Sequence, residues 1–274
     1  MGKIRRQSEV GIYHIYLRGN SRSIIFYDDE DRRQFCRCLE RAREKHNAKI
    51  YAYVLMDNHI HMLIKCDLID KFVSSIMVSF VMVYNKKYKL TDRLCQSPYS
   101  SAVKDSYKKI RNSLIYILQN PIKGKMCINP EDYKWSSYNM YFNKQYESYM
   151  HLKSKNISMM DKIKFKVEVD TSMAEEMFET KVDLDNELKL NSQSVSEKEI
   201  YEKEDNWKKI SHSELCAEFK RVLDGRVFAS LSKHDLRIIA KTLMTETSAS
   251  YGQIASLLHV AYEFVRRLKY KNPL

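Results

Sequence analysis

The sequence predicts an α+β fold for its first half and an all-α region at its end, and three observations support this prediction. Short alternating segments rich in β-branched and aromatic residues are typical of strands. They occur at residues 11–18, 49–56 and 62–65. Residues 28–45 and 67–88 repeat apolar side chains at helical spacing, which favours two helices flanking the strands. After residue 207 the patterns are helical only.

We expect three parts along the 274 residues. Residues 1–147 hold the sheet and its helices, residues 148–206 form a helical and acidic connector, and residues 207–274 form the all-α region. Within the connector, residues 159–178 show a modest helical pattern, whereas residues 183–205 are acidic and polar without an apolar period. That composition favours a solvated segment that is partly helical or flexible.

The formal net charge of +12 indicates a polyanionic partner, and nucleic acid is the usual one. The positive charge is concentrated between Tyr84 and Lys125, where Lys and Arg residues far outnumber Asp and Glu. No apolar run approaches the roughly 20 residues that span a membrane. The N-terminus lacks the apolar core of a signal peptide. We therefore expect a soluble, cytoplasmic protein with no membrane partner.

The six cysteines are scattered and form no Cys-x-x-Cys pair, which favours reduced thiols. Cys36 and Cys38 lie in a helical pattern, where positions two apart do not face each other. A zinc site there is not expected.

The segment MDNHIHMLI, which starts at Met56, predicts a buried strand with two histidines near its beginning. Alternation places Ile60 and Met62 on one face and His59 and His61 on the other. Two imidazoles on one face can converge on a single cation. The alternative is a pair of half-exposed histidines at a strand entry without any ligand role.

A helix is expected to begin after Asp105 or Ser106 and to end before Pro121. Its apolar stripe consists of Tyr107, Ile110, Leu114, Ile117 and Leu118. At about 100° per residue, Tyr116 points away from this stripe and shares a polar, outward face with Asn120. Lys109 lies near the same face. The alternative is that Tyr116 is an ordinary surface or groove tyrosine.

The last 68 residues suit a helix-turn-helix, with helices at 251–258 and 261–270 joined at His259. The glycine common in that turn is absent, and His259 takes its place. The final helix, which would enter a major groove, carries Arg266, Arg267 and Lys269. The alternative is a small three-helix bundle that binds nothing.

Several ordered motifs together resemble those of the single-tyrosine HUH transposases, most closely the REP-associated tyrosine transposases. The likeness covers roughly residues 8–145. The motifs begin at Tyr13 (YHI), Arg18 (RGN), Ile25 (IF), Tyr53 (YVLM), Asn58 (NHIH), Tyr116 (YILQNP) and Tyr133 (YKWSSY). The sequence from Cys95 to Tyr99 departs from the family, whose members carry a glycine-led, basic stretch there.

The resemblance implies a ferredoxin-like antiparallel sheet flanked by helices, with the histidines on a central strand. It implies that Tyr116 is a nucleophile that forms a 5′-phosphotyrosine, and that His59, His61 and Asn120 hold Mg²⁺ or Mn²⁺. The implied reaction is nicking and strand transfer on single-stranded or hairpin DNA. Charge and position add Arg18, Asn20 and Lys109 as DNA contacts, and the C-terminal region as a contact for duplex DNA.

Two other functions fit the same residues. A domesticated regulator would keep the fold and bind DNA without cutting it, and a metal-dependent hydrolase would use the histidines to activate water. The sequence leaves open whether the protein is a monomer or a homodimer, and whether Tyr116 serves its own subunit.

Overall fold

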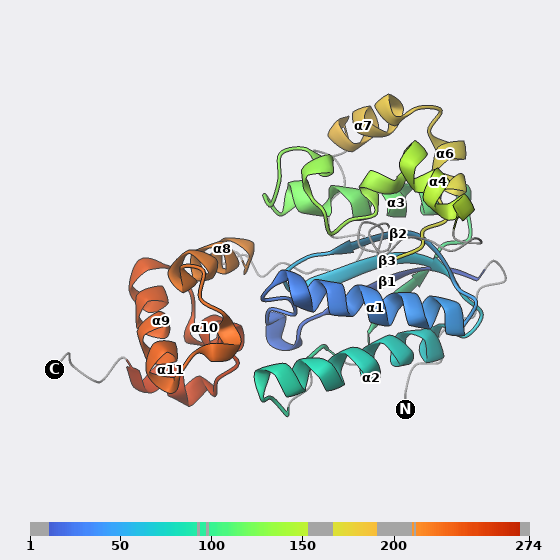
Figure 1. Ribbon diagram of the computed structural model, residues 1–274. Coiled ribbons are helices and arrows are strands. Elements are labelled where there is room, and N and C mark those ends of the chain that lie inside the picture. The colour runs from blue at the N-terminus through green and yellow to red at the C-terminus, as the bar shows by residue number, and fades with distance from the viewer. Residues whose placement is uncertain are drawn as a thin grey trace.

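The computed structural model describes residues 11–91, 94–96, 99–152, 167–190, 210 and 212–268. Four strands, of which β2 and β3 follow each other directly, are interspersed with helices before an all-helical C-terminal region (Figure 1). The elements are β1 (Ile12–Arg18), α1 (Asp29–Lys45), β2 (Lys49–Leu55), β3 (His59–Lys65), α2 (Ile69–Tyr88), β4 (Ser100–Val103), α3 (Tyr107–Lys123), α4 (Lys144–Leu152), α6 (Ser172–Met177), α7 (Lys181–Leu190), α8 (His212–Leu223), α9 (Lys233–Glu246), α10 (Tyr251–Leu257) and α11 (Tyr262–Leu268), with 3-10 turns η1 (Asn20–Arg22), η2 (Pro130–Asp132), η3 (Tyr138–Met140) and η6 (Phe228–Ser230).

The four strands form one antiparallel sheet in the order β2-β3-β1-β4. The expected antiparallel sheet is therefore confirmed, and the histidine strand is one of its two central strands. The strand begins at His59, so both histidines lie at its start, as the segment from Met56 predicted. Its register sets Arg18 opposite His59 and Tyr16 opposite His61.

Helices cover both faces of the sheet (Figure 1). α1 and α2 pack on one face through the expected apolar side chains, among them Phe35, Phe72 and Phe80. A capping box formed by Asp28 and Asp31 starts α1, whose first turn is acidic. Helical spacing after Phe72 and Phe80 also predicts a buried Val83, but this residue is 39% exposed and Tyr84 is buried instead. Tyr84 follows Phe80 by four residues and so shares its face.

The other face of the sheet is covered by α3, which differs from its prediction in two ways. The helix continues through Pro121 to Lys123, because a proline in the last turn forgoes only one backbone bond. Residues 113–121 are buried on every side. Tyr107, expected in the apolar stripe, is instead 59% exposed at the first turn.

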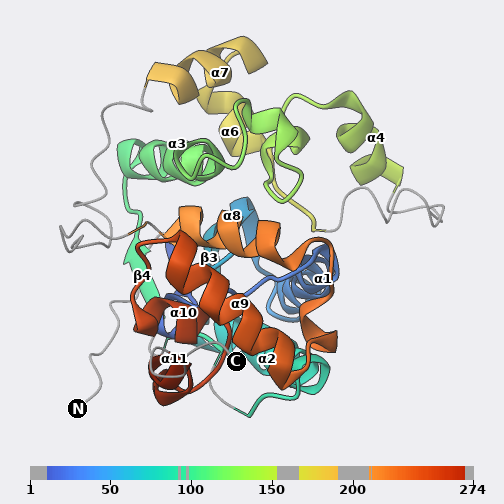
Figure 2. The same ribbon diagram turned by 90° about the vertical axis from the view of Figure 1, so that its left-hand side faces the viewer.

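The reason for this burial is that α6 and α7 lie over the side of α3 that faces away from the sheet (Figures 1 and 2). Leu184 and Leu188 of α7 are buried in the same core as the sheet, and Gln119 Nε2 donates to Leu188 O at 2.7 Å. The expectation of a solvated connector is thus wrong for α7. Residues 159–166 and 191–205 of that connector lie outside the described residues.

The helices α8 to α11 enclose a second core that contains Phe219, Leu243 and Val265. These helices lie beside the end of the sheet where β1 finishes and β3 begins (Figure 2). His259, in the turn between α10 and α11, has φ of +49°, the left-handed conformation that glycine usually supplies. No helix in the described ranges is long and apolar enough to cross a bilayer.

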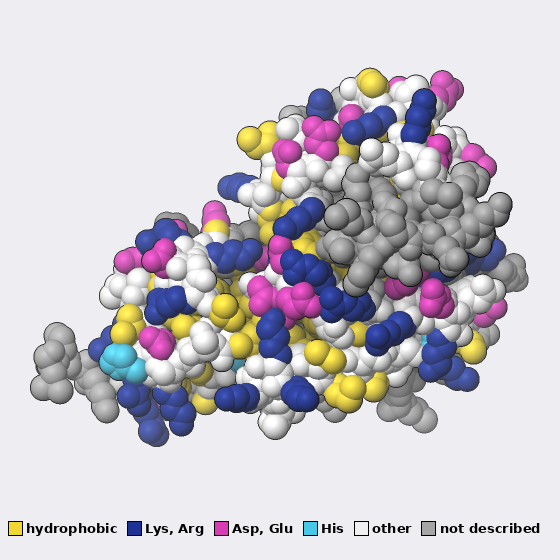
Figure 3. Space-filling model, viewed as in Figure 1, with side chains coloured by type: hydrophobic (Ala, Val, Ile, Leu, Met, Phe, Trp, Pro, Cys, Tyr) yellow, Lys and Arg dark blue, Asp and Glu magenta, His cyan; other side chains and the backbone are white. Residues whose placement is uncertain are grey.

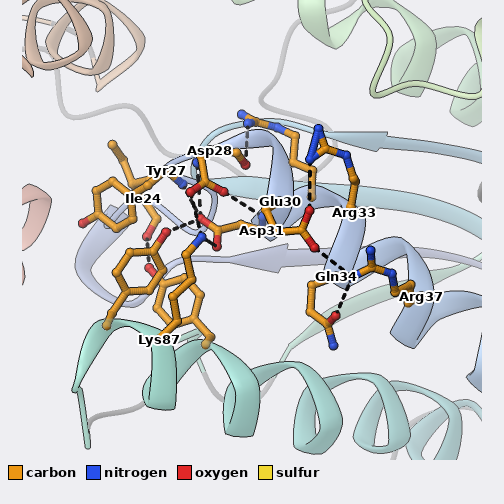
Figure 4. A network of polar contacts seen from close by, with 12 residues as sticks. Ile24, Tyr27, Asp28, Glu30, Asp31, Arg33, Gln34, Arg37 and Lys87 are labelled. Carbon is orange, nitrogen blue, oxygen red and sulfur yellow. Dashed lines mark hydrogen bonds and ion pairs between the residues drawn. The ribbon is translucent and has the colours of Figure 1, made fainter. Parts of the chain in front are cut away.

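Tyr27 connects the second core to the sheet domain. Its hydroxyl donates to Leu257 O at 2.6 Å, and its ring stacks on Phe228 with centroids 4.0 Å apart. A polar network holds this tyrosine, because its N–H donates to the Asp31 carboxylate (Figure 4). Lys87 of α2 contacts both Asp28 and Asp31 at 2.7 Å. The C-terminal helices therefore pack against a part of the sheet domain that this polar network holds in place.

Candidate active site

His59 and His61 extend from β3 toward α3. Their ring centroids lie 5.2 Å apart, and Tyr16 from the neighbouring β1 stacks on His61 at 4.7 Å. His61 is buried, whereas His59, at the strand entry, is half-buried. The alternation of the strand brings both imidazoles to the α3 face, as predicted, but that face is covered rather than open.

Tyr116 of α3 lies against these histidines. Its ring meets the His61 ring edge-on at 5.2 Å and the His14 ring at 5.8 Å. The prediction that Tyr116 points outward is wrong, since it is only 8% exposed. The face of α3 that looks polar in the sequence is turned toward the sheet, and the opposite side is covered by α7. Lys123 Nζ lies 5.5 Å from the centre of the Tyr116 ring, which places a positive charge beside the phenol.

Asn120 lies one turn after Tyr116 and faces His59. Its Oδ1 is 3.4 Å from His59 Nε2, while its Nδ2 donates to Tyr116 O at 2.8 Å. Because the amide nitrogen is used in that bond, the oxygen is the atom presented to the imidazole. The predicted meeting of Tyr116 and Asn120 with the two histidines is therefore what the fold produces.

The hydrogen bonds around His59 define its tautomer. His59 Nδ1 lies 2.7 Å from Asn58 Oδ1, which can only accept, so Nδ1 carries the proton. In the neutral imidazole, Nε2 then presents a lone pair to Asn120 Oδ1, a second acceptor. Two acceptors that face each other are suited to a cation between them.

His14 of β1 completes the group of imidazoles. Its Nε2 lies 3.0 Å from His61 Nδ1, and its side chain is fully buried. Burial, followed by the nearby positive charge of Lys104, lowers the pKa of His14 to about 3. Burial also lowers the pKa of His61 well below its usual value, with further contributions from His14 and His59. Both rings are therefore neutral near pH 7.

The donor set fits a divalent cation. Among the described residues, no group of three or more His, Cys, Asp and Glu side chains could hold a metal ion. An ion at this site would be held by His59 and His61 and would take its third protein ligand from the amide of Asn120. Imidazole and carbonyl oxygen together are compatible with Mn²⁺ and Mg²⁺.

The remaining predicted contacts are divided between the site and the surface. Arg18 lies opposite His59 in the sheet and is half-buried. Asn20 is exposed in η1, beside α10. Lys109 lies in the first turn of α3, where it pairs with Asp105 at 2.7 Å.

Arg266 and Arg267 are exposed on α11, and Lys269 lies outside the described residues. On the face shown in Figure 3, Lys and Arg occur on both parts of the molecule, interspersed with Asp and Glu.

The sequence reasoning missed two groups of residues. His14 and Tyr16 could have been found, because strand alternation places these two side chains on the same face of β1. The register pairs Tyr16 with His61, so this is the face that carries the histidines of β3. His212 and Lys220 of α8 carried none. The pKa of His212 is lowered to about 4 by burial and then by Arg18 and His59, so this C-terminal residue is close to the site. Lys220 reaches Asp57, two residues before His59.

A histidine pair on a central strand of an antiparallel sheet, facing a helix that carries a tyrosine and an amide, defines a candidate phosphoryl-transfer site. Residues 8–114 match the family described as "Transposase IS200 like". This part of the chain is similar to that family, in agreement with the expected resemblance to single-tyrosine transposases. The matched segment contains His14, His59 and His61 but ends before Tyr116 and Asn120.

One solved structure similar to this chain is described as "Structure of the REP associates tyrosine transposase bound to a REP hairpin". The identity is 15%, the TM-score is 0.43, and the likeness covers 63% of this chain and 94% of the other. A search of curated proteins found no match.

Proposed function

We propose that this protein nicks single-stranded or hairpin DNA and transfers the strand through a 5′-phosphotyrosine at Tyr116, with the aid of a divalent metal ion. The observation that carries the proposal is the meeting of α3 with β3. The Tyr116 ring lies 5.2 Å from the His61 ring, and Asn120 Oδ1 lies 3.4 Å from His59 Nε2. Tyr116, the proposed nucleophile, thus lies beside the three side chains proposed as metal ligands.

The chemistry needs no activated cofactor. The Tyr116 oxygen loses its proton and attacks the phosphorus, the bond to the 3′ oxygen breaks, and that oxygen leaves as a 3′-hydroxyl. Rejoining reverses these steps with the 3′-hydroxyl of another DNA end, so the energy of the phosphodiester is kept in the protein–DNA bond. Mg²⁺ or Mn²⁺ bound by His59, His61 and Asn120 would polarise the scissile phosphate and neutralise its developing charge.

Cationic side chains around Tyr116 support a phosphate substrate. Lys123 lies beside the phenol ring, and Arg18 lies opposite His59 in the sheet. A positive field in a partly buried site stabilises both the bound phosphodiester and the charge that develops during attack.

The direct test is the formation of covalent protein–DNA adducts. Labelled hairpin and single-stranded oligonucleotides are incubated with the full chain and Mn²⁺, and adducts are separated by denaturing electrophoresis. Wild type should form an adduct whose attached peptide contains Tyr116, and Tyr116→Phe should form none. Tyr107→Phe, an exposed tyrosine of the same helix, is the matched control and should react like wild type.

The two competing functions give different products. A non-cutting DNA-binding regulator would bind the oligonucleotides without releasing any fragment. A hydrolase that activates water would cut them without a covalent species, and its activity would survive Tyr116→Phe. Either result would exclude the phosphotyrosine mechanism.

The C-terminal helices form the second part of the proposal. We assign α10 and α11 to duplex recognition in the manner of a helix-turn-helix, with Arg266 and Arg267 on the helix that would enter a groove. The left-handed His259 between the two helices supports this assignment, because it supplies the turn that the motif needs. The close contact of α10 with η1 would place such a duplex beside the nicking site.

A further inference from the structure

Metal binding depends on which imidazole is the donor in the hydrogen bond between His14 and His61. His61 Nδ1 lies 3.0 Å from His14 Nε2. If His61 donates, its proton is on Nδ1 and its Nε2 keeps a lone pair. If His14 donates, the neutral His61 carries its proton on Nε2 and cannot act as a ligand through that atom.

We propose that His14 is a positioning residue that accepts a hydrogen bond from His61 and so holds His61 in the tautomer that can bind a cation through Nε2. The inference rests on the proposed function, because it concerns the same metal site. His14 acts through His61 and is not itself a ligand.

The neighbouring ligand histidine has the same arrangement. His59 Nδ1 faces the acceptor Asn58 Oδ1 at 2.7 Å. Both histidines of β3 thus have a hydrogen-bond partner at Nδ1, a side-chain amide oxygen for His59 and a second imidazole for His61. Histidines that bind metals usually donate their other N–H to such a partner, which fixes the orientation of the ring.

The burial of His14 argues that its polar atoms have a purpose. The side chain is fully buried on β1, where an apolar residue would pack without the cost of desolvating an imidazole. Its ring also lies 5.8 Å from that of Tyr116, so a shift of His14 would disturb the nucleophile as well as the ligand.

The test uses two readouts that do not require DNA cleavage. Long-range ¹H–¹⁵N NMR spectra of histidine-labelled protein report the tautomer of His61, which is assigned with His61→Gln. Free Mn²⁺ measured by electron paramagnetic resonance gives the Mn²⁺ affinity of the full chain. Wild type should show the Nδ1–H tautomer at His61. His14→Phe should lose the fixed tautomer and bind Mn²⁺ roughly 10- to 100-fold more weakly.

His14→Gln is the conservative variant, since its amide oxygen can accept the same bond, and its Mn²⁺ affinity should stay within about threefold of wild type. His46→Phe, far from the site between α1 and α2, should not change the affinity. Three results would overturn the inference: an Nε2–H tautomer in the wild type, unchanged Mn²⁺ affinity in a folded His14→Phe, or equal losses in the Phe and Gln variants. If His14→Phe does not fold, the tautomer of His61 in the wild type and the Mn²⁺ affinity of His14→Gln still test the inference.

The two proposals can fail separately. Tyr116→Phe should bind Mn²⁺ like wild type while forming no adduct, so a loss of cleavage alone leaves the role of His14 intact. A wild type that binds no Mn²⁺ would contradict the metal dependence of the proposed function, and the His61 tautomer would still test the inference about His14.

Discussion

Lys220 Nζ lies 2.7 Å from Asp57 Oδ2, and this ion pair connects α8 of the C-terminal region to the turn that precedes the histidine strand. Asp57 also accepts from Arg32 of α1 through its other oxygen. One carboxylate thus joins three parts of the molecule within two residues of His59. Its two partners differ in environment, because the Arg32 side chain is 6% exposed and the Lys220 side chain is 45% exposed.

This difference predicts unequal effects of substitution on the free energy of unfolding. Lys220→Met should cost no more than about 1 kcal/mol, because a half-exposed pair is screened by solvent. Asp57→Asn should cost roughly 3 kcal/mol or more, because it leaves the buried Arg32 charge uncompensated. Urea unfolding of both variants measures the two values. Equal costs would mean that Arg32 is not the main partner of Asp57.

Acid should destabilise the protein before its carboxylates titrate. In the folded state the pKa of His14 is lowered to about 3 and that of His212 to about 4, whereas both titrate near 6.5 when unfolded. The unfolded chain therefore binds more protons below pH 6.5, and folding stability falls as the pH falls. Each residue should contribute a loss of about 2 kcal/mol between pH 7 and pH 5.

Urea unfolding at several pH values, with His212→Gln compared with wild type, checks this pH dependence. The variant should lose less stability between pH 7 and pH 5 than wild type does. The same loss in both proteins would show that His212 is protonated as readily in the folded state as in the unfolded one.

The packing of α7 over α3 predicts that Leu184 is a core residue despite its acidic surroundings in the sequence. Leu184→Ala should lower the free energy of unfolding by roughly 2–5 kcal/mol, because it removes a fully buried side chain. Val182→Ala is the control from the same helix, where the side chain is 64% exposed, and it should change stability by less than about 0.5 kcal/mol. Similar small effects in both variants would contradict the packing.

The proposed role of α11 predicts a separation of duplex binding from cleavage. Arg267→Ala should weaken duplex binding and reduce its salt slope by about one, because one phosphate contact is lost. Adduct formation on a short single-stranded oligonucleotide should be unchanged. Arg33→Ala, an exposed arginine on α1, is the comparison and should leave the salt slope as it is. A normal slope in Arg267→Ala would remove this arginine from the duplex contact.

Much of the fold could be predicted because its signals are local. Alternation identified β1, β2 and the histidine strand, and helical spacing identified α1 and α2. The side of α3 that faces the sheet could not be predicted, because the opposite side of this helix is covered by α7, which shows only two leucines at helical spacing in an acidic segment. Lys220 and His212 were missed for a similar reason: they reach the site through contacts more than 150 residues away in the chain. A single-residue rule also failed at Pro121, because a proline in the last turn of a helix forgoes only one backbone bond.

The hydrogen bond from Asn120 Nδ2 to Tyr116 O links the proposed ligand and nucleophile through one turn of the same helix. Because both groups lie on one helix, any displacement of α3 would move them together relative to the histidines of the sheet. Turning α3 by a single residue, about 100°, would withdraw both groups together. A displaced α3 would therefore leave the histidines of β3 without either the proposed nucleophile or the proposed third ligand.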